Sequence, residues 1–141
     1  MTRDQVHGRR TVEFLVVSSG RSGGQLTSEI GMEPDNVRNG SGRFAHEVAW
    51  VVRAAGDGES DLSTLIEDLL ARVEPFIVGV ERLVKTSDDV AVLRIVQYIG
   101  DDPVGPGFSL TSSAIETLSR VGAMLDVDQY LDLDAATTAD P

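Results

Sequence analysis

The sequence predicts a single-domain α+β fold: a two-layer sandwich with a mostly antiparallel sheet and helices packed on one face. Three observations support this prediction. Short apolar runs of strand length alternate with segments whose apolar residues recur at helical spacing. No internal repeat or interdomain linker separates these segments. The length of 141 residues suits one domain, and a hydrophobic content of 41% can supply its core.

The expected order of elements is β-α-β-α-β-β-α. The first strand has apolar side chains on both faces in its second half, which is typical of a central strand. Gly31 and Pro34 end the first helix, because glycine readily takes a left-handed cap and proline cannot continue a helix. The polar residues 35–42 predict a loop. We expect strands at residues 11–18, 46–54, 89–99 and 107–110, and helices at residues 25–30, 62–74, 76–85 and from residue 111 or 112 onward.

The second half of the chain predicts one helical region, divided at Pro75, before a hairpin and another helix after it. Apolar residues recur every three or four positions from Leu62 to Val73, with Ser60 or Asp61 as the N-cap. Pro75 should end this helix and begin the next helical piece. A turn rich in glycine and proline then joins the third strand to a short antiparallel edge strand. The buried stripe of the last helix is expected to be Ile115, Leu118 and Val121, and it can extend to Met124.

The ends of the chain suggest simple boundaries. We expect residues 1–10 to form a flexible arm, residues 11–133 to form the domain, and the acidic residues 134–141 to fray. The apolar run at residues 14–17 is too short for a signal peptide, and no window approaches the roughly 20 apolar residues of a membrane span. The chain has no cysteine, so disulfides, thiolate metal sites and a thiol nucleophile are excluded. A soluble, cytoplasmic protein is the expectation.

The net charge of −11 is unevenly distributed along the chain. Residues 1–45 hold six arginines against five acidic residues, whereas the remainder carries six basic and 18 acidic side chains. Such a surface repels phosphate backbones, which argues against nucleic-acid binding. It favours a basic protein partner, although it can also serve solubility alone.

An ordered set of short signals resembles one protein family. These signals are the run Leu26–Pro34, the glycine-bearing loop before Trp50, the helix ending in Arg72-Val73-Glu74-Pro75, and the run from Gly107 to Tyr130. Over about residues 11–131 the chain resembles the DUF4279 family. The resemblance implies a compact, single-domain bacterial protein. The family supplies no reaction, ligand or cofactor that could be assigned to this chain.

The sequence offers few candidates for catalysis or metal binding. His46 precedes Glu47, but consecutive strand residues point to opposite faces, so the pair is badly placed for acid–base work. No nucleophile elbow or nucleotide-binding glycine spacing occurs, and no cofactor is expected. The acidic cluster lacks the glycine and distal glutamate of a calcium loop, so its aspartates are interpreted as solvated between apolar anchors at Val127, Leu131 and Leu133. The cluster comprises Asp126, Asp128, Asp132 and Asp134.

The basic residues near the N-terminus are the candidates for a ligand or partner surface. Arg21 lies in a glycine-rich loop, residues 19–24, that could hold an anion but is better interpreted as a connector. Arg38 and Arg43 lie on the predicted loop before Trp50. Trp50 is interpreted as a core anchor in preference to a pocket residue. Any ligand site is expected between Arg21, this loop and Trp50.

These observations leave three functional hypotheses. The preferred one is a non-enzymatic protein-binding module, of the immunity or antitoxin kind, whose acidic face blocks a basic effector. The second is a domain that senses a small molecule or anion through Arg21, Arg38 and Arg43. An enzyme of unrecognised type ranks last, because two histidines and no cysteine leave few groups that transfer protons near neutral pH.

Overall fold

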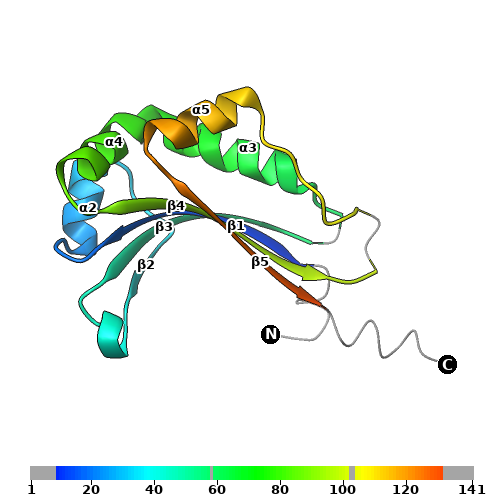
Figure 1. The fold of residues 1–141 in the computed structure, drawn as a ribbon, viewed down its shortest axis with the longest axis horizontal. Helices are drawn as coiled ribbons and strands as arrows, with labels where there is room; N and C mark the ends of the chain where they lie inside the picture. Colours follow the sequence, from blue (N-terminus) through cyan, green and yellow to red (C-terminus); the bar gives the residue numbers. More distant parts are fainter. Residues whose placement is uncertain (1–8, 58, 102–103, 132–141) are drawn as a thin grey trace.

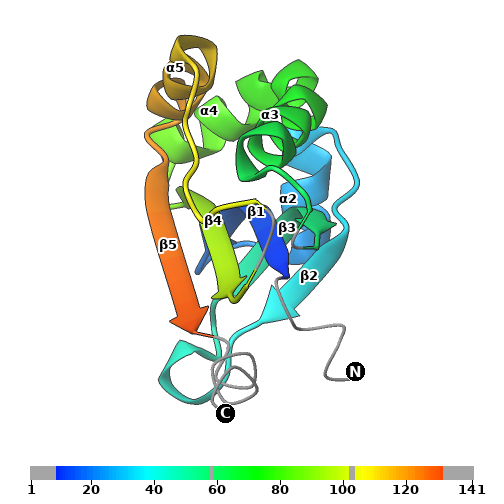
Figure 2. The ribbon, with the colours of Figure 1, turned by 90° about the vertical axis from the view of Figure 1, so that its right-hand side faces the viewer.

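A computed structural model describes residues 9–57, 59–101 and 104–131. It has an α+β fold in which one five-stranded sheet, in the order β2-β3-β1-β4-β5, is covered by helices on one face (Figures 1 and 2). The strands are β1 (Arg10–Ser18), β2 (Asn36–Asn39), β3 (Val48–Gly56), β4 (Val90–Ile99) and β5 (Met124–Leu131). The helices are α2 (Gly23–Ile30), α3 (Leu62–Val73), α4 (Ile77–Thr86) and α5 (Ser112–Arg120). The predicted fold class is therefore confirmed.

The sheet is antiparallel except at one edge. β1 lies at the centre and pairs antiparallel with β3 on one side and with β4 on the other. β2 adds antiparallel to β3, whereas β5 runs parallel to β4. Parallel neighbours need a crossover connection, and α5 supplies it between β4 and β5.

The main core lies between the sheet and the helices. Trp50 and Phe14 are fully buried in it, so the interpretation of Trp50 as a core residue is confirmed. Helix α3 presents its predicted apolar stripe to this layer. The principal side chains of this core are Val12, Phe14, Val16, Trp50, Val52, Leu93 and Ile95 from the sheet and Leu26, Ile66, Leu69, Val73, Val80, Leu83 and Leu118 from the helices.

The opposite face of the sheet, called here the open face, carries no helix among the described residues (Figure 2). A second, smaller apolar cluster forms on it from Leu15, Val51 and Val92. Leu15 alternates along β1 with Phe14 and Val16, which face the helices. The prediction that β1 is a central strand with apolar residues on both faces is thus confirmed.

Several predicted helix signals are also confirmed. Asp61 caps α3 by accepting a hydrogen bond from the backbone N–H of Ser63. Gly31 takes the left-handed C-cap of α2, with φ of 85°. At Pro75 a 3-10 turn, η2 (Glu74–Phe76), separates α3 from α4.

The predicted loop at residues 35–42 was wrong for Asn36–Asn39, which form β2. A short 3-10 turn, η1 (Gly42–Phe44), then leads into β3. The hydrophobic pattern of the sequence did not predict β2, because the strand is polar and Val37 is its one large apolar residue. The strand forms because the edge of β3 offers backbone partners, beginning with the hydrogen bond from Asp35 N to Val51 O.

The end of the chain also differs from the prediction. Residues 107–110 form no strand; Ser109 N instead donates to Ser63 Oγ of α3 at 2.9 Å. The last helix stops at Arg120, and a turn with φ of 60° at Gly122 leads into β5. The expected stripe of α5 is shifted, since Ala114 is buried in place of Ile115, which is 54% exposed. The extension of the last helix toward Met124 was wrong because Met124 begins β5. This exposed edge strand does not alternate strictly between buried and exposed residues, so its sequence carries no clear strand pattern.

The structure corrects one residue of the expected N-terminal boundary. β1 begins at Arg10, a buried residue that donates to the carbonyl oxygens of Val104 and Ser60, so Arg10 does not belong to a flexible arm. The rest of the expected arm before residue 9 and the expected tail at 134–141 lie outside the described residues. Within the described ranges, no helix combines the length and apolar character needed to cross a membrane.

Candidate functional site on the open face

A row of alternating charges crosses the open face. The sheet register aligns Arg53 of β3 with Glu13 of β1, Glu13 with Arg94 of β4, and Arg94 with Asp126 of β5. Residues in register point to the same face of a sheet, so the four side chains form one line across four strands. The row lies on the face opposite to Trp50 and Phe14.

Glu13 is the buried member of this row. Its side chain is only 5% exposed, and both of its carboxylate oxygens accept hydrogen bonds from the guanidinium of Arg38. A buried carboxylate needs such a partner because an unpaired buried charge is costly. The pairing neutralises Glu13 and places Arg38 over the middle of the open face.

The two arginines of the row, Arg94 and Arg53, differ in whether their guanidinium groups have an acidic partner. Arg94 Nε donates to Asp126 Oδ2 at 2.9 Å. Arg53 is exposed, and within the described part of the chain its guanidinium makes no hydrogen bond or ion pair. Asp35 contributes a through-space attraction to it. Arg53 is therefore the group of the row best placed to meet an external anion.

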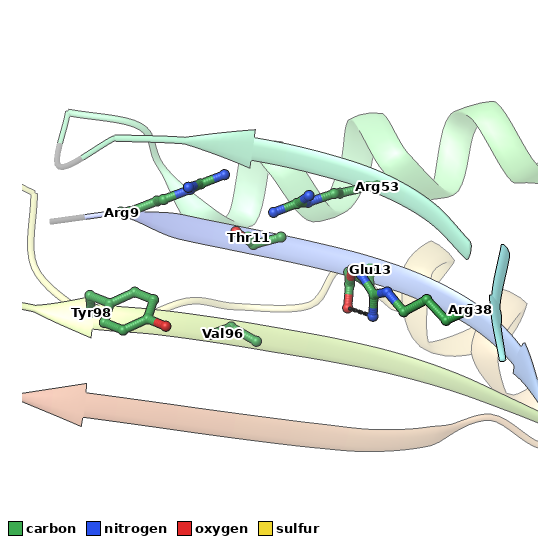
Figure 3. Close-up of a pocket in the computed structure, with 7 residues that line it drawn as sticks. All are labelled: Arg9, Thr11, Glu13, Arg38, Arg53, Val96 and Tyr98. Carbon is green, nitrogen blue, oxygen red and sulfur yellow. Dashed lines mark hydrogen bonds and ion pairs between the residues drawn. The ribbon is translucent and has the colours of Figure 1, made fainter. Parts of the chain in front are cut away.

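Two hollows lie on the open face, one on either side of the Glu13–Arg38 pair. The first encloses about 280 Å³ and is lined by Arg9, Thr11, Glu13, Arg38, Arg53, Val96 and Tyr98 (Figure 3). The second encloses about 210 Å³ over an apolar floor that includes Leu15, Val17 and Ala49. A further hollow of about 370 Å³ lies on the other layer, between α3 and α5.

The structure does not bring the four predicted site residues together. Trp50 faces the helices while Arg38 lies on the open face, because Arg38 pairs in register with Ala49, the neighbour of Trp50. Arg43 lies in η1 and lines none of the three hollows. The four residues therefore do not line one space between Arg21, the loop and Trp50, and the reason is the strand pairing of β2.

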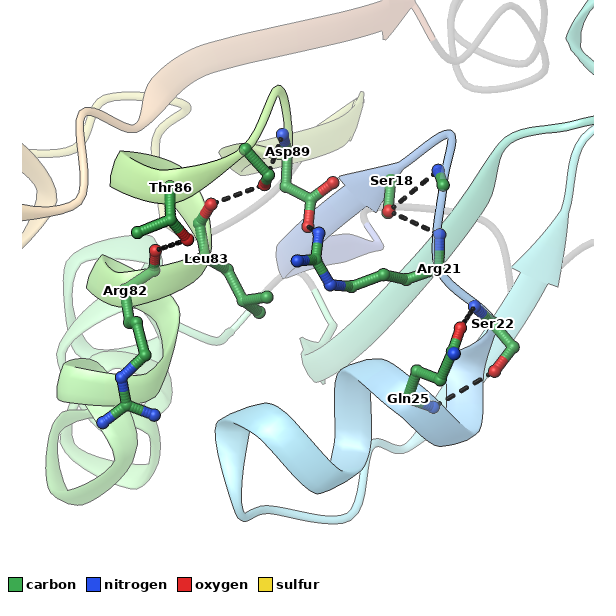
Figure 4. A network of polar contacts seen from close by, with 10 residues as sticks. Ser18, Arg21, Ser22, Gln25, Arg82, Leu83, Thr86 and Asp89 are labelled. Atoms are coloured by element: carbon green, nitrogen blue, oxygen red, sulfur yellow. Dashed lines mark hydrogen bonds and ion pairs between the residues drawn. The ribbon is translucent and has the colours of Figure 1, made fainter.

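Arg21 has a structural role at the end of β1. Its Nη1 donates to Asp89 Oδ2 at 2.9 Å, and the Asp89 side chain is only 4% exposed (Figure 4). Ser18 Oγ accepts from the backbone N–H of Arg21, while Ser22 and Gln25 form a capping box at the start of α2. Side chains thus already accept from the backbone N–H groups of Gly20, Arg21, Ser22 and Gln25, which an anion would otherwise use. This is compatible with the connector interpretation of residues 19–24.

Those acidic and histidine candidates that the structure describes do not form a site either. No group of three or more potential metal ligands occurs among the described residues. Asp126 is paired with Arg94, and Asp132 and Asp134 lie outside the described residues. The predicted anchors are exposed, with Leu131 at 74%, and Leu133 is not described. His46 is an exposed turn residue before β3.

The residues that matter on the open face were missed in the sequence. Glu13, Arg53 and Arg94 are single charges within otherwise apolar strands, and their alternation with Phe14, Val52 and Leu93 was a usable signal. That signal places each charge away from the core. The register that aligns the three charges depends on long-range pairing, which the sequence alone did not reveal.

Comparison with known protein families identifies one family that matches most of the chain. A family described as "Domain of unknown function (DUF4279)" matches residues 5–132, nearly the whole chain. The chain belongs to the DUF4279 family. No curated protein and no solved structure shows significant similarity to this DUF4279 protein.

Within the described ranges of this DUF4279 protein, the exposed large apolar side chains are concentrated on the edge strand β5. Nine large hydrophobic side chains are exposed among the described residues, and five of them lie on this strand. β5 ends the sheet, and no described strand pairs with its outer edge. The five side chains are Met124, Leu125, Val127, Tyr130 and Leu131.

Proposed function

We propose that this DUF4279 protein is a non-enzymatic binding module that accepts an extended basic segment of another protein along the outer edge of β5. An immunity or antitoxin protein that blocks a basic effector would act in this way. The observation that carries the proposal is the concentration of exposed apolar side chains on a long edge strand whose outer edge pairs with no described strand. Apolar patches of this kind mark interaction sites on soluble domains.

The backbone of β5 supports this mode of binding. The strand has eight residues, whereas the opposite edge strand, β2, has four. A long edge strand presents unpaired N–H and C=O groups that can pair with an added strand. Alternate side chains then supply specificity, and Leu125 and Val127 lie on the helix side of the sheet, in register with Leu93 and Ile95.

Charge argues for a basic occupant. Asp126 and Asp128 lie on the other face of β5, and the protein as a whole carries a net charge of −11. A partner strand with lysine or arginine opposite these aspartates gains cross-strand attraction and a faster encounter. A second copy is a poorer occupant, because a two-fold antiparallel pair would bring the aspartates of both strands together.

Site-specific photo-crosslinking tests this proposal. A benzoylphenylalanine would replace Val127 on β5, and the matched control would replace Val78, an exposed residue of α4 that is distant in sequence and in fold. Both proteins would be irradiated in native host lysate at moderate and high salt. We expect a product at position 127 that is absent at position 78, weakens with salt, and maps to a lysine- or arginine-rich segment of one protein.

Three results would contradict the proposal. Identical products at both positions would indicate non-specific capture. A crosslink from position 127 to a second copy of the chain would assign the edge to self-association. A specific product that maps to a neutral or acidic segment would remove the charge argument.

A further inference from the structure

We infer that the first hollow of the open face is a binding site for a small aromatic oxyanion, such as an aryl phosphate, held by Arg53 and Thr11 beside Tyr98. This site is separate from the β5 edge and does not depend on the proposed protein partner. It also differs from the site expected from the sequence, since only Arg38 is common to both.

The charge balance of the open face supports an anionic ligand. Arg38 is matched by Glu13 and Arg94 by Asp126, so neither carboxylate is left to repel a ligand. The Arg53 guanidinium remains without a hydrogen-bonded acceptor among the described residues. A guanidinium offers a planar fork of donors that fits phosphate and carboxylate oxygens.

The arrangement of side chains directs these donors into one space. Figure 3 shows the Arg9 and Arg53 side chains extending toward one another, with Thr11 of β1 beside them. The hydroxyl of Thr11 can donate a further hydrogen bond to an oxyanion. The Arg53 guanidinium and the Thr11 hydroxyl form a donor set suited to an oxyanion.

The β4 side of the hollow suits an aromatic group. Tyr98 and Val96 of β4 line it. The Tyr98 ring is stacked on Tyr130 of β5, with ring centroids 5.3 Å apart and an angle of 23° between the rings. Stacking restrains the Tyr98 ring and makes it a platform for a second ring. The volume of about 280 Å³ limits the ligand to a single ring with a small substituent.

The test is a titration followed by two-dimensional amide NMR, with phenyl phosphate as the probe and inorganic phosphate and phenol as comparators. We expect saturable shifts for phenyl phosphate at the amides of Thr11, Arg53 and Val96. Phenyl phosphate should bind more tightly than either comparator, because each of them makes only half of the contacts.

Two variants and a control locate the site. Arg53→Gln should weaken phenyl phosphate binding about tenfold, the usual cost of losing a charge-assisted hydrogen bond. Tyr98→Leu should weaken phenyl phosphate but leave the affinity for inorganic phosphate unchanged. Arg120→Gln is the matched control, because Arg120 lies on α5 and pairs with Glu81 of α4; it should bind as the unmodified protein does.

Two outcomes would overturn the inference. Linear shifts of equal size for phenyl phosphate and inorganic phosphate would indicate weak, unspecific ion binding. Unchanged phenyl phosphate affinity in a folded Arg53→Gln protein would remove Arg53 from the site. Neither outcome bears on the β5 crosslink, so the two proposals fail independently.

Discussion

Arg38 on edge strand β2 reaches across β3 to hold Glu13 on the central strand β1. The strand order is β2-β3-β1, and Arg38 Nη1 lies 3.2 Å from Glu13 Oε1. The Glu13 side chain is 5% exposed, whereas that of Arg38 is 40% exposed. One ion pair thus links β2 to β1 across β3 and separates the two hollows of the open face.

Breaking this pair from the arginine side should destabilise the fold. Arg38→Gln leaves the Glu13 carboxylate without its forked donor, and we expect a loss of about 1–3 kcal/mol in the free energy of unfolding. The double variant Arg38→Gln, Glu13→Gln should lose less than the sum of the single variants, because it leaves no buried charge. Urea denaturation measures all three proteins. Strict additivity would show that the two side chains do not interact.

Gly79 should tolerate no side chain. It lies where α4 crosses α2, and an added Cβ would come within 2.6 Å of Glu29 O and 2.8 Å of Ile30 Cα. Backbone atoms cannot move aside cheaply, so Gly79→Ala should cost about 1–3 kcal/mol in urea denaturation. Gly20→Ala is the control, because its Cβ would meet no atom within 4 Å. Equal stability of the two variants would contradict the close helix contact.

Trp50 should be essential for its volume and not for a hydrogen bond. It is fully buried, and its Nε1 has no hydrogen-bond partner in the described structure. We expect Trp50→Ala to cost about 3–5 kcal/mol, and Trp50→Phe to cost clearly less because it keeps a ring and loses no bond. Circular dichroism should follow unfolding, since both variants lack the only tryptophan. A Trp50→Ala protein as stable as the original would refute the core role.

The ion pair between Asp35 and Arg72 should give a measurable pH dependence. Hydrogen bonds from the Arg72 guanidinium lower the pKa of Asp35 below its ordinary value of 3.8, and the backbone N–H of Arg53 adds to this effect while burial opposes it. Because the pKa is lower in the folded state, the pair stabilises the protein above about pH 4. This contribution is lost as the pH falls through the folded-state pKa.

Replacing Arg72 tests this linkage. In Arg72→Gln the pKa of Asp35 should rise toward 3.8, as measured by NMR titration of the side-chain carboxyl carbon. Glu81 is the internal control, because Arg120 hydrogen bonds to it and lowers its pKa independently of Arg72. An Asp35 pKa that does not change in Arg72→Gln would show that the guanidinium has no influence on it.

Local signals in the sequence were sufficient for much of the fold. The apolar spacing from Leu62 to Val73, the break at Pro75 and the cap at Gly31 all correspond to features of the structure. Trp50, which the sequence indicated as a core anchor, is buried in the main core. These features depend on interactions between residues close in sequence, or on burial, which hydrophobic patterning reports directly.

The rest of the fold and the arrangement of charges on the open face depend on pairing between strands that are distant in the sequence. β2 is a strand only because β3 lies beside it, and β5 is parallel to β4 only because α5 carries the chain across. The register places Glu13 between Arg53 and Arg94, and strand order places Arg38 within reach of Glu13. Residue types and periodicity specify which way a strand residue faces; which charges become neighbours on that face follows only once the strands have paired.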